Sequence, residues 1–280
     1  MIKNYTTAPL PFQGQKRNFI KEFKIALKSY PEDAIYVDLF GGSGLLSHTV
    51  KQENPKATVI YNDFDNYKQR LNAISRTNKI LSKLRIIVAD LPPKKTIPEE
   101  IKQQILEVIS KEDEKGFVDY ISLSGSLLFS MNYVQSLAKL KKQPFYNSVR
   151  KSDFDASNYL DGVEIVTADY KELFAKYRDC KNVVFLVDPP YLSTDCKTYK
   201  NYWKLADYLD VLKVLKDTNY FYFTSNKSSI VELCEWIETN TASQNPFNKA
   251  KIVYRYSTTT HNTGYTDIML HKNYTTTVII

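Results

Sequence analysis

The chain is poor in the residues that build disulfide frameworks and metal centres. Of its 280 residues, three are cysteine and three are histidine. Cys180, Cys196 and Cys234 are widely spaced and include no CxxC pair, which argues against a disulfide framework and a structural zinc site. The histidines show no HExxH spacing. We therefore expect no metal, and we take a reducing cytoplasm as the default location.

Long hydrophobic runs are also missing. No segment approaches 18 consecutive apolar residues, and the N-terminal MIKNYTTAPLPF lacks the apolar segment of a secretory signal, so we expect no membrane partner. Hydrophobic residues make up 43% and charged residues 25%, as in a globular protein with one large domain or a domain carrying an inserted lobe. The 38 basic and 31 acidic residues leave a net charge of +7, which is compatible with a polyanionic partner.

Short apolar runs alternate with amphipathic stretches, which predicts an α/β fold with a mainly parallel sheet. The expected strands are 34–40, 57–63, 84–90, 163–169, 182–188 and 220–226, followed by 251–257 and 265–271. A polar TTTHNTG loop joins the last two, which predicts a C-terminal antiparallel hairpin. The expected helices are 15–29, 44–54, 66–82, 98–113, 170–177, 204–217 and 229–240.

The alternation of strands and helices breaks between residues 91 and 161. This stretch opens with PPKKTIPEE and continues through segments of helical pattern. We interpret it as an inserted, mostly helical lobe within a catalytic domain formed by 1–90 and 162–280. A few ordinary surface helices are the alternative.

A glycine-rich loop follows the first expected strand. Residues 38–44 read DLFGGSG, in which Gly41, Gly42 and Gly44 let the backbone turn tightly and approach a ligand. The loop matches neither the GxGxxG fingerprint nor a P-loop. Because Asp38 places a carboxylate at the strand end, the loop suits a ligand with a cationic part, such as S-adenosylmethionine (AdoMet). A plain strand-to-helix turn is the alternative.

Asp63 ends the next expected strand and is positioned to accept the two ribose hydroxyls of an adenosyl group. The neighbouring Asp65 could instead serve as a helix N-cap.

A second motif, Asp188-Pro189-Pro190-Tyr191, directly follows the apolar run VVFLV. The two prolines lack N–H donors and hold fixed φ angles, so they end the strand. They leave the Asp188 carboxylate and a proline carbonyl as convergent acceptors for an amino group, with Tyr191 as a stacking surface. A rigid strand-terminating turn is the structural alternative.

Together these residues resemble the Dam-like (D12 class) adenine-specific DNA methyltransferases over most of the chain. The matching segments follow the family's order: PFQGQKR (11–17), DLFGGSG, YNDF (61–64), ADY (168–170), DPPY, FTSN (223–226) and YTDIML (265–270). Gln15 and Pro11 depart from the family's pattern, and 91–161 has no match. Asp90 and Asp169 both end an IxxAD pattern, and we assign Asp169 because it lies 19 residues before Asp188, where the family has its motif.

The resemblance implies a Rossmann-like AdoMet-dependent methyltransferase with a target-recognition insertion at 91–161. AdoMet would be held by Phe12, Lys16, Asp38, Phe40, Gly41, Gly42, Gly44, Asp63, Phe64, Asp169 and Tyr170. Asp188, Pro189, Pro190 and Tyr191 would be catalytic, methylating the N6 amine of an adenine flipped out of duplex DNA. Lys16 and Arg17 could instead be solvated residues at a helix start, and Phe12 a core residue.

Two basic segments with interleaved aromatic residues are candidates for DNA contact. The first carries Lys141, Lys142, Arg150 and Lys151, with Phe145 and Tyr146 between them; the second carries Lys197, Tyr199 and Lys200 and continues to Trp203. The alternative for the first segment is a solvated basic face. The alternative for the second is that its Trp203 is an ordinary core residue.

Two other functions remain open at this stage. A DPP-bearing methyltransferase of ribosomal RNA shares the amino-group chemistry, and a non-catalytic DNA-binding relative shares the fold. Methylation of a protein glutamine would fit NPPY better than DPPY. We favour a monomer. The sequence does not decide whether a companion restriction endonuclease exists.

Overall fold

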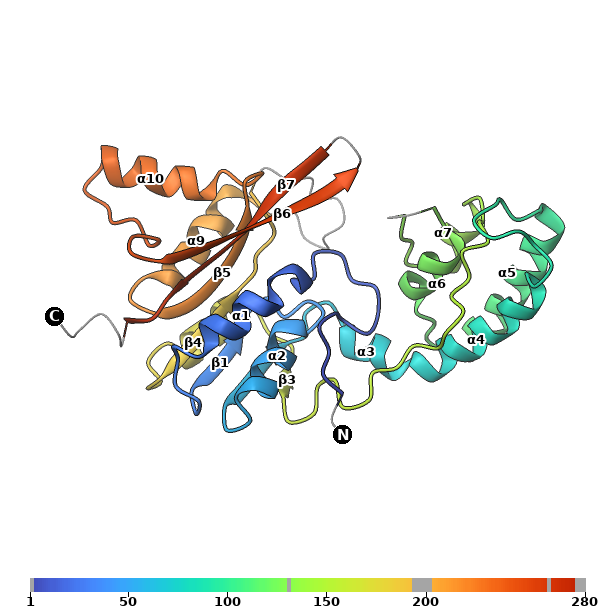
Figure 1. Ribbon diagram of the computed structural model, residues 1–280, viewed down its shortest axis with the longest axis horizontal. Coiled ribbons are helices and arrows are strands. Elements are labelled where there is room, and N and C mark those ends of the chain that lie inside the picture. The colour runs from blue at the N-terminus through green and yellow to red at the C-terminus, as the bar shows by residue number, and fades with distance from the viewer. Residues whose placement is uncertain (1–2, 130–131, 193–202, 261–262, 275–280) are drawn as a thin grey trace. The chain divides into compact units, whose positions relative to one another are not determined.

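The computed structural model describes residues 3–129, 132–192, 203–260 and 263–274, without the side chains of 257–260 and 263. The chain divides into two compact units (Figure 1). The sheet unit comprises Asn4–Thr7, Gln15–Asp65 and Leu160–Ile280, and the helical unit comprises Met1–Lys3, Ala8–Gly14 and Asn66–Tyr159.

The sheet unit is built on a seven-stranded sheet with the order β3-β2-β1-β4-β5-β7-β6. Its strands are β1 (Ile35–Asp38), β2 (Thr58–Asn62), β3 (Glu164–Val166), β4 (Val183–Val187), β5 (Asn219–Ser225), β6 (Lys251–Thr260) and β7 (Thr263–Lys272). Strands β1 to β5 are parallel, whereas β7 runs antiparallel to β5 and to β6. The expected α/β fold and its C-terminal hairpin are therefore confirmed.

Helices cover both faces of this sheet. The 3-10 turn η1 (Arg17–Phe19), α1 (Ile20–Leu27) and α2 (Leu45–Glu53) pack on one face, and α8 (Tyr170–Tyr177), α9 (Leu205–Leu215) and α10 (Ile230–Asn240) on the other. All five residues of β4 are buried. Val184 and Leu186 belong to one apolar cluster, and Phe185 to the other. Burial on both faces explains why this strand is a continuous apolar run.

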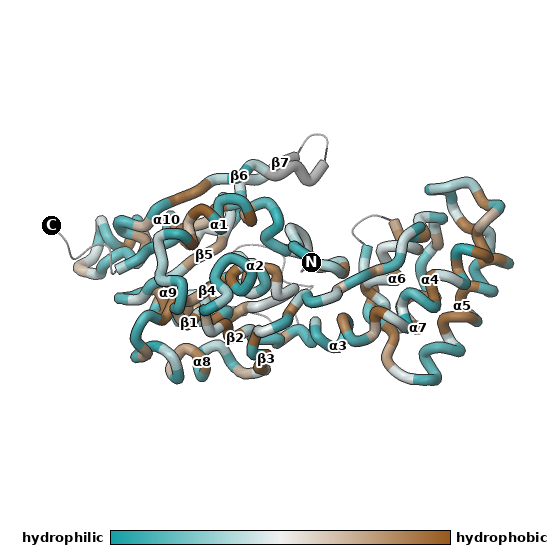
Figure 2. The backbone as a smooth tube through the Cα atoms, turned by 60° about the horizontal axis from the view of Figure 1, so that its bottom comes forward, coloured by the Kyte–Doolittle hydropathy of each residue, from teal (hydrophilic) through white to brown (hydrophobic). Residues whose placement is uncertain are grey.

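The helical unit contains α3 (Tyr67–Asn72), α4 (Ile74–Ile87), α5 (Glu99–Asp113), α6 (Tyr120–Leu127) and α7 (Leu137–Lys141). Hydrophobic and hydrophilic residues alternate along α4 and α5, as their colours show (Figure 2). The main segment of this unit starts at Asn66, upstream of the 91–161 stretch, because α4 packs against α5 and α6. The expected 66–82 helix divides into α3 and α4 around Ala73.

The prediction of a strand over 84–90 is wrong, because α4 continues through this segment as far as Ile87. Thr77, Ile80, Leu81 and Leu84 are buried at helical spacing, so LRII completes an amphipathic stripe. Ile86 points outward and is 77% exposed. A short run of apolar and β-branched residues fits either period, and here the preceding helix decides between them.

Candidate functional site

Two aspartates lie at the carboxyl ends of neighbouring strands, at the point where the strand order reverses. Asp38 is the last residue of β1, and Asp188 directly follows β4. The two strands are parallel neighbours, with Asp38 opposite Leu186. On one side of this pair the sheet continues to β2 and β3, and on the other to β5. In open α/β sheets, ligands bind beyond the carboxyl ends of the strands at such a switch point.

The loop after β1 lies so close to β2 that Gly41 has no room for a side chain. A Cβ atom there would be 2.2 Å from Cε2 of the Tyr61 ring and 2.8 Å from the Asn62 carbonyl oxygen. Gly44 has a φ of +72° and caps α2. The packing of the loop therefore requires glycines, and this packing brings the N-terminus of α2 to the carboxyl edge of the sheet.

The Asp38 carboxyl group is buried at this edge. Its Oδ2 atom accepts a hydrogen bond of 2.7 Å from the Ser47 hydroxyl. Its Oδ1 atom is buried without a well-formed hydrogen bond among the described residues. Burial raises the pKa of Asp38 to about 7, and the bond from Ser47 counteracts this rise. A cationic ligand group at Oδ1 would favour the charged carboxylate.

Asp63 follows β2 and is also buried. The Tyr61 hydroxyl lies 3.0 Å from its Oδ1 atom. Phe64, the next residue, is 48% exposed. The N-cap of α3 is Asn66, so Asp65 does not take the helix-capping role that the sequence left open.

The Asp169-Tyr170 pair lies at the third strand end. Asp169 is exposed and caps α8, because its Oδ1 atom accepts a hydrogen bond of 2.8 Å from the Lys171 amide. The Tyr170 ring lies 5.0 Å from the Phe40 ring, and Trp203 lies 5.8 Å from Phe40 and 5.9 Å from Tyr170. Tyr170 therefore forms one aromatic cluster with Phe40, which follows β1, and Trp203, which follows β4 along the chain. Asp90 follows a helix, so Asp169 is the one of the two aspartates that lies at a strand end.

The DPPY motif contacts the N-terminal segment through Lys16. The Lys16 Nζ atom lies 2.5 Å from Oδ2 of Asp188, with the two side chains 9% and 19% exposed. The same ammonium lies 5.5 Å from the centroid of the Tyr191 ring. Pro189 and Pro190 are buried. The structure thus brings two predicted motifs, PFQGQKR (11–17) and DPPY, into direct contact through Lys16 and Asp188.

Asp267 on β7 is a site residue that the sequence analysis did not assign. It lies opposite Ser225 at the end of β5 and is buried. Burial raises the pKa of Asp188; the positive charge of Lys16 opposes this increase and the negative charge of Asp267 adds to it. The available signal was a carboxylate directly before the apolar residues Ile268, Met269 and Leu270 of the expected strand 265–271.

The predicted DNA-contacting residues of the helical unit are at its surface. Lys141, Lys142, Arg150 and Lys151 are exposed, and the Arg150 guanidinium stacks 4.5 Å from the centroid of the Phe154 ring. Phe145 is fully buried, so it is a core residue and not the exposed ring expected between these cations.

Phe129 is more exposed than Phe117, the other exposed phenylalanine described in this unit, at 70% against 42%, and its ring lies 5.9 Å from that of Tyr146. Phe12 also belongs to the helical unit, where its ring packs edge-on against Tyr67 at 5.6 Å.

Three predicted DNA-contacting residues, Lys197, Tyr199 and Lys200, lie outside the described residues. Within the described ranges, no group of three or more His, Cys, Asp or Glu side chains is arranged to hold a metal ion. In the same ranges, no helix is both long and apolar enough to cross a membrane.

Comparison with known proteins identifies two extensive similarities. A family model described as "D12 class N6 adenine-specific DNA methyltransferase" matches residues 12–258. A Haemophilus influenzae (strain Rd) protein named "Putative methyltransferase" is 38% identical over 279 residues, covering 96% of this chain and 93% of the relative.

Similarities to solved structures are weaker. A precorrin-6y C5,15-methyltransferase from Geobacter metallireducens aligns with a TM-score of 0.38 at 9% identity, covering 97% of this chain and 100% of the other. An rRNA methylase from Streptococcus thermophilus aligns with a TM-score of 0.35 at 7% identity, covering 94% and 100%. The family assignment rests on the two sequence similarities alone.

Proposed function

The chain belongs to the D12 class of N6 adenine-specific DNA methyltransferases, and from that premise we propose that it methylates the N6 amine of an adenine in duplex DNA, with AdoMet as the methyl donor. The observation that carries this proposal is the environment of Asp188. Its carboxylate, 19% exposed, lies at the switch point of the sheet, beside Pro189, and already binds an N–H donor, the Lys16 ammonium.

The carboxyl edge of the sheet offers groups that suit each part of AdoMet. The buried Asp38 carboxyl suits the ammonium, and the loop of Gly41, Gly42 and Gly44 suits the methionine part. Asp63, buried at the end of β2, suits the ribose hydroxyls. The rings of Phe40 and Tyr170 supply apolar surface for the purine. Bound there, AdoMet supplies an electrophilic methyl group.

The chemical role proposed for Asp188 and Pro189 is to activate a poor nucleophile. The lone pair of the adenine N6 is delocalised into the ring. Acceptance of the N6 hydrogens by the Asp188 carboxylate and the Pro189 carbonyl favours a tetrahedral nitrogen and stabilises the positive charge that develops on it. These acceptors also orient the amine. The incoming amine competes with Lys16 for Asp188, because Lys16 Nζ lies at the Oδ2 atom.

The target base has to leave the stacked duplex to reach this edge, at a cost of a few kcal/mol. Stacking on Tyr191 offsets about 1–3 kcal/mol of that cost. In the helical unit, which we propose as the target-recognition unit, the cations Lys141, Lys142, Arg150 and Lys151 would contact phosphates. The exposed Phe129 is its best-placed ring for contact with bases.

AdoMet binding is expected to depend on pH through Asp38. Its pKa of about 7 means that part of the carboxyl population must lose a proton before it can accept the ligand's ammonium. Lowering the pH from 7.5 to 6 should therefore weaken the binding of S-adenosylhomocysteine by about tenfold, since each pH unit below the pKa costs up to a factor of ten. Titration calorimetry across this range measures the effect, and Asp38→Asn should remove most of it. An equal slope in the variant would show that another group titrates.

DNA binding is expected to weaken steeply with salt. Each neutralised phosphate adds about −0.9 to the slope of log K against log salt concentration. The double substitution Lys141→Ala, Lys142→Ala should therefore make the slope shallower by about two. Fluorescence anisotropy with duplex DNA at several salt concentrations measures it. The matched control is the double substitution Lys28→Ala, Lys181→Ala. It removes two exposed lysines that precede β1 and β4, at the amino edge of the sheet. An equal change in both double variants would contradict the assignment of this surface.

The proposed substrate is tested by offering duplex DNA and ribosomal RNA side by side with radiolabelled AdoMet. We expect transfer to adenine in the DNA and none to the RNA. Transfer to the RNA alone would instead assign the chain to rRNA methylation, and binding of DNA without turnover of AdoMet would identify a non-catalytic relative.

A further inference from the structure

We propose that the Tyr61 hydroxyl is a positioning group that aims the Asp63 carboxylate at the ribose of AdoMet. Tyr61 would not touch the reacting atoms, and its effect would be on cofactor affinity. This inference rests on the proposed function, since it assumes that Asp63 receives an adenosyl ribose.

The hydroxyl group stands between two acceptors. Its oxygen atom lies 2.8 Å from the Gly42 carbonyl oxygen and 3.0 Å from Oδ1 of Asp63, and it can donate its hydrogen to either. A phenol carries a single hydrogen, so the hydroxyl donates to one of these acceptors at a time, and the charged carboxylate is the stronger of the two. The hydroxyl therefore links the orientation of the Asp63 carboxylate to the position of the glycine loop.

The backbone around Asp63 is held by other groups. The Asp63 amide donates to the Val166 carbonyl at 2.8 Å. The Asn62 side chain donates to the Leu39 and Ala168 carbonyls, each at 3.0 Å, and accepts from the Ala168 amide at 3.1 Å. These bonds fix the spacing of the ends of β1, β2 and β3. Loss of the Tyr61 hydroxyl would therefore leave the strand ends in place and remove a bond that orients the carboxylate.

Tyr61→Phe separates this positioning role from packing. The substitution keeps the ring that lies against Gly41, so the loop retains its contact and the variant should fold. Tyr36→Phe is a matched control, because Tyr36 is an equally buried tyrosine on β1 whose hydroxyl accepts a bond from Asn54 instead. Both variants lose one buried hydroxyl, and only one of these faces the proposed ribose site.

The affinity for S-adenosylhomocysteine, measured by titration calorimetry, gives the first readout. We expect Tyr61→Phe to weaken binding about tenfold, the loss of about one hydrogen bond to a charged group, and Tyr36→Phe to leave it unchanged. In methylation assays, Tyr61→Phe should raise the KM for AdoMet and leave kcat at saturating AdoMet and the KM for DNA unchanged. An unchanged affinity in Tyr61→Phe would overturn the inference and leave the proposed function standing. Failure of the wild-type protein to bind the ligand would overturn both.

A ribose-modified ligand tests whether the hydroxyl acts through Asp63. The wild-type protein should bind S-adenosylhomocysteine more tightly than its 2′-deoxy analogue. In Tyr61→Phe this preference should shrink, because a misaligned carboxylate gains less from the hydroxyl. Equal weakening of both ligands would show that Tyr61 acts elsewhere and would contradict the proposal.

Discussion

Asp188→Ala is expected to lower the rate of methyl transfer at saturating AdoMet by at least about 100-fold, the scale of losing one preorganised hydrogen-bonding group in an active site. The variant keeps the Pro189 carbonyl but lacks the carboxylate that would hold the amine and stabilise its developing charge. Binding of S-adenosylhomocysteine should change little, because Asp38 and Asp63 remain. Single-turnover methylation and titration calorimetry measure the two quantities separately.

Asp33→Ala is the control for this experiment. Asp33 is an exposed aspartate just before β1, at the amino edge of the sheet, and its loss should leave both quantities unchanged. Substantial methyl transfer by Asp188→Ala would remove the carboxylate from the mechanism. A parallel loss of ligand affinity would show instead that Asp188 organises the cofactor site.

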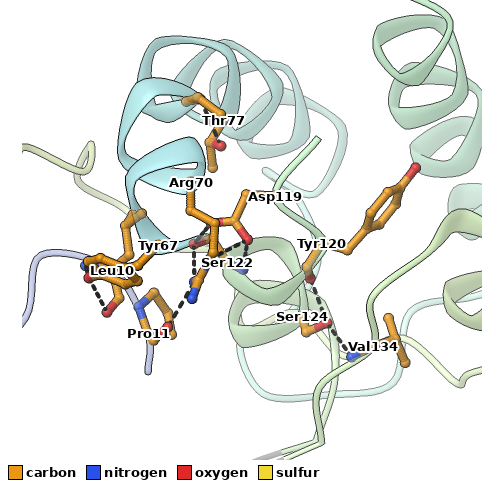
Figure 3. Close-up of polar contacts among 11 residues, drawn as sticks. Leu10, Pro11, Tyr67, Arg70, Thr77, Asp119, Tyr120, Ser122, Ser124 and Val134 are labelled. Carbon is orange, nitrogen blue, oxygen red and sulfur yellow. Dashed lines mark hydrogen bonds and ion pairs between the residues drawn. The ribbon is translucent and has the colours of Figure 1, made fainter. Parts of the chain in front are cut away.

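The largest loss of stability is expected from Asp119→Ala in the helical unit. Asp119 is 1% exposed and Arg70 is 7% exposed, and their Oδ1 and Nε atoms are 3.0 Å apart (Figure 3). Asp119 also accepts bonds from the Ser122 amide and hydroxyl at the start of α6, while Arg70 donates to the Pro11 carbonyl at 2.8 Å. Removing the carboxylate leaves a buried guanidinium uncompensated, at a cost of about 3–5 kcal/mol in the free energy of unfolding.

Urea unfolding followed by circular dichroism measures this cost. Asp153→Ala is the matched control: Asp153 also pairs with an arginine, Arg85, at 2.7 Å, but is 60% exposed. Its loss should cost less than about 1 kcal/mol. Replacing both Arg70 and Asp119 with apolar residues should recover much of the stability, because no buried charge remains. Equal costs for the two single variants would contradict the argument from burial.

The strand ends of the sheet were predictable because each carries a local signal. Asp38, Asp63 and Asp188 follow short apolar runs, and residues at the carboxyl ends of parallel strands meet at one edge of the sheet whatever the loops do. The fold class was predictable from the alternation of short apolar runs with amphipathic stretches. The split of 66–82 into α3 and α4 has no comparable signal, and the helical conformation of residues 84–87 depends on the packing of α4 against α5.

Contacts between distant segments could not be predicted from the sequence. The Lys16–Asp188 pair joins residues 172 positions apart (188 − 16), and no local pattern specifies it. The burial of Phe145 depends on the tertiary packing of the helical unit, so its position between Lys142 and Arg150 was misleading. Tyr61 was matched only as part of the YNDF segment, with no role of its own, and its hydroxyl contacts with Gly42 and Asp63 are seen only in the structure.

Nucleoside mass spectrometry identifies the methylated base. A host strain without adenine methylation would express either the wild-type chain or Asp188→Ala, and its DNA would be hydrolysed and analysed. We predict N6-methyldeoxyadenosine in DNA from the wild-type strain and none from the variant. DNA without N6-methyldeoxyadenosine despite expression of a folded, AdoMet-binding protein, or with the methyl group on cytosine, would contradict the proposal.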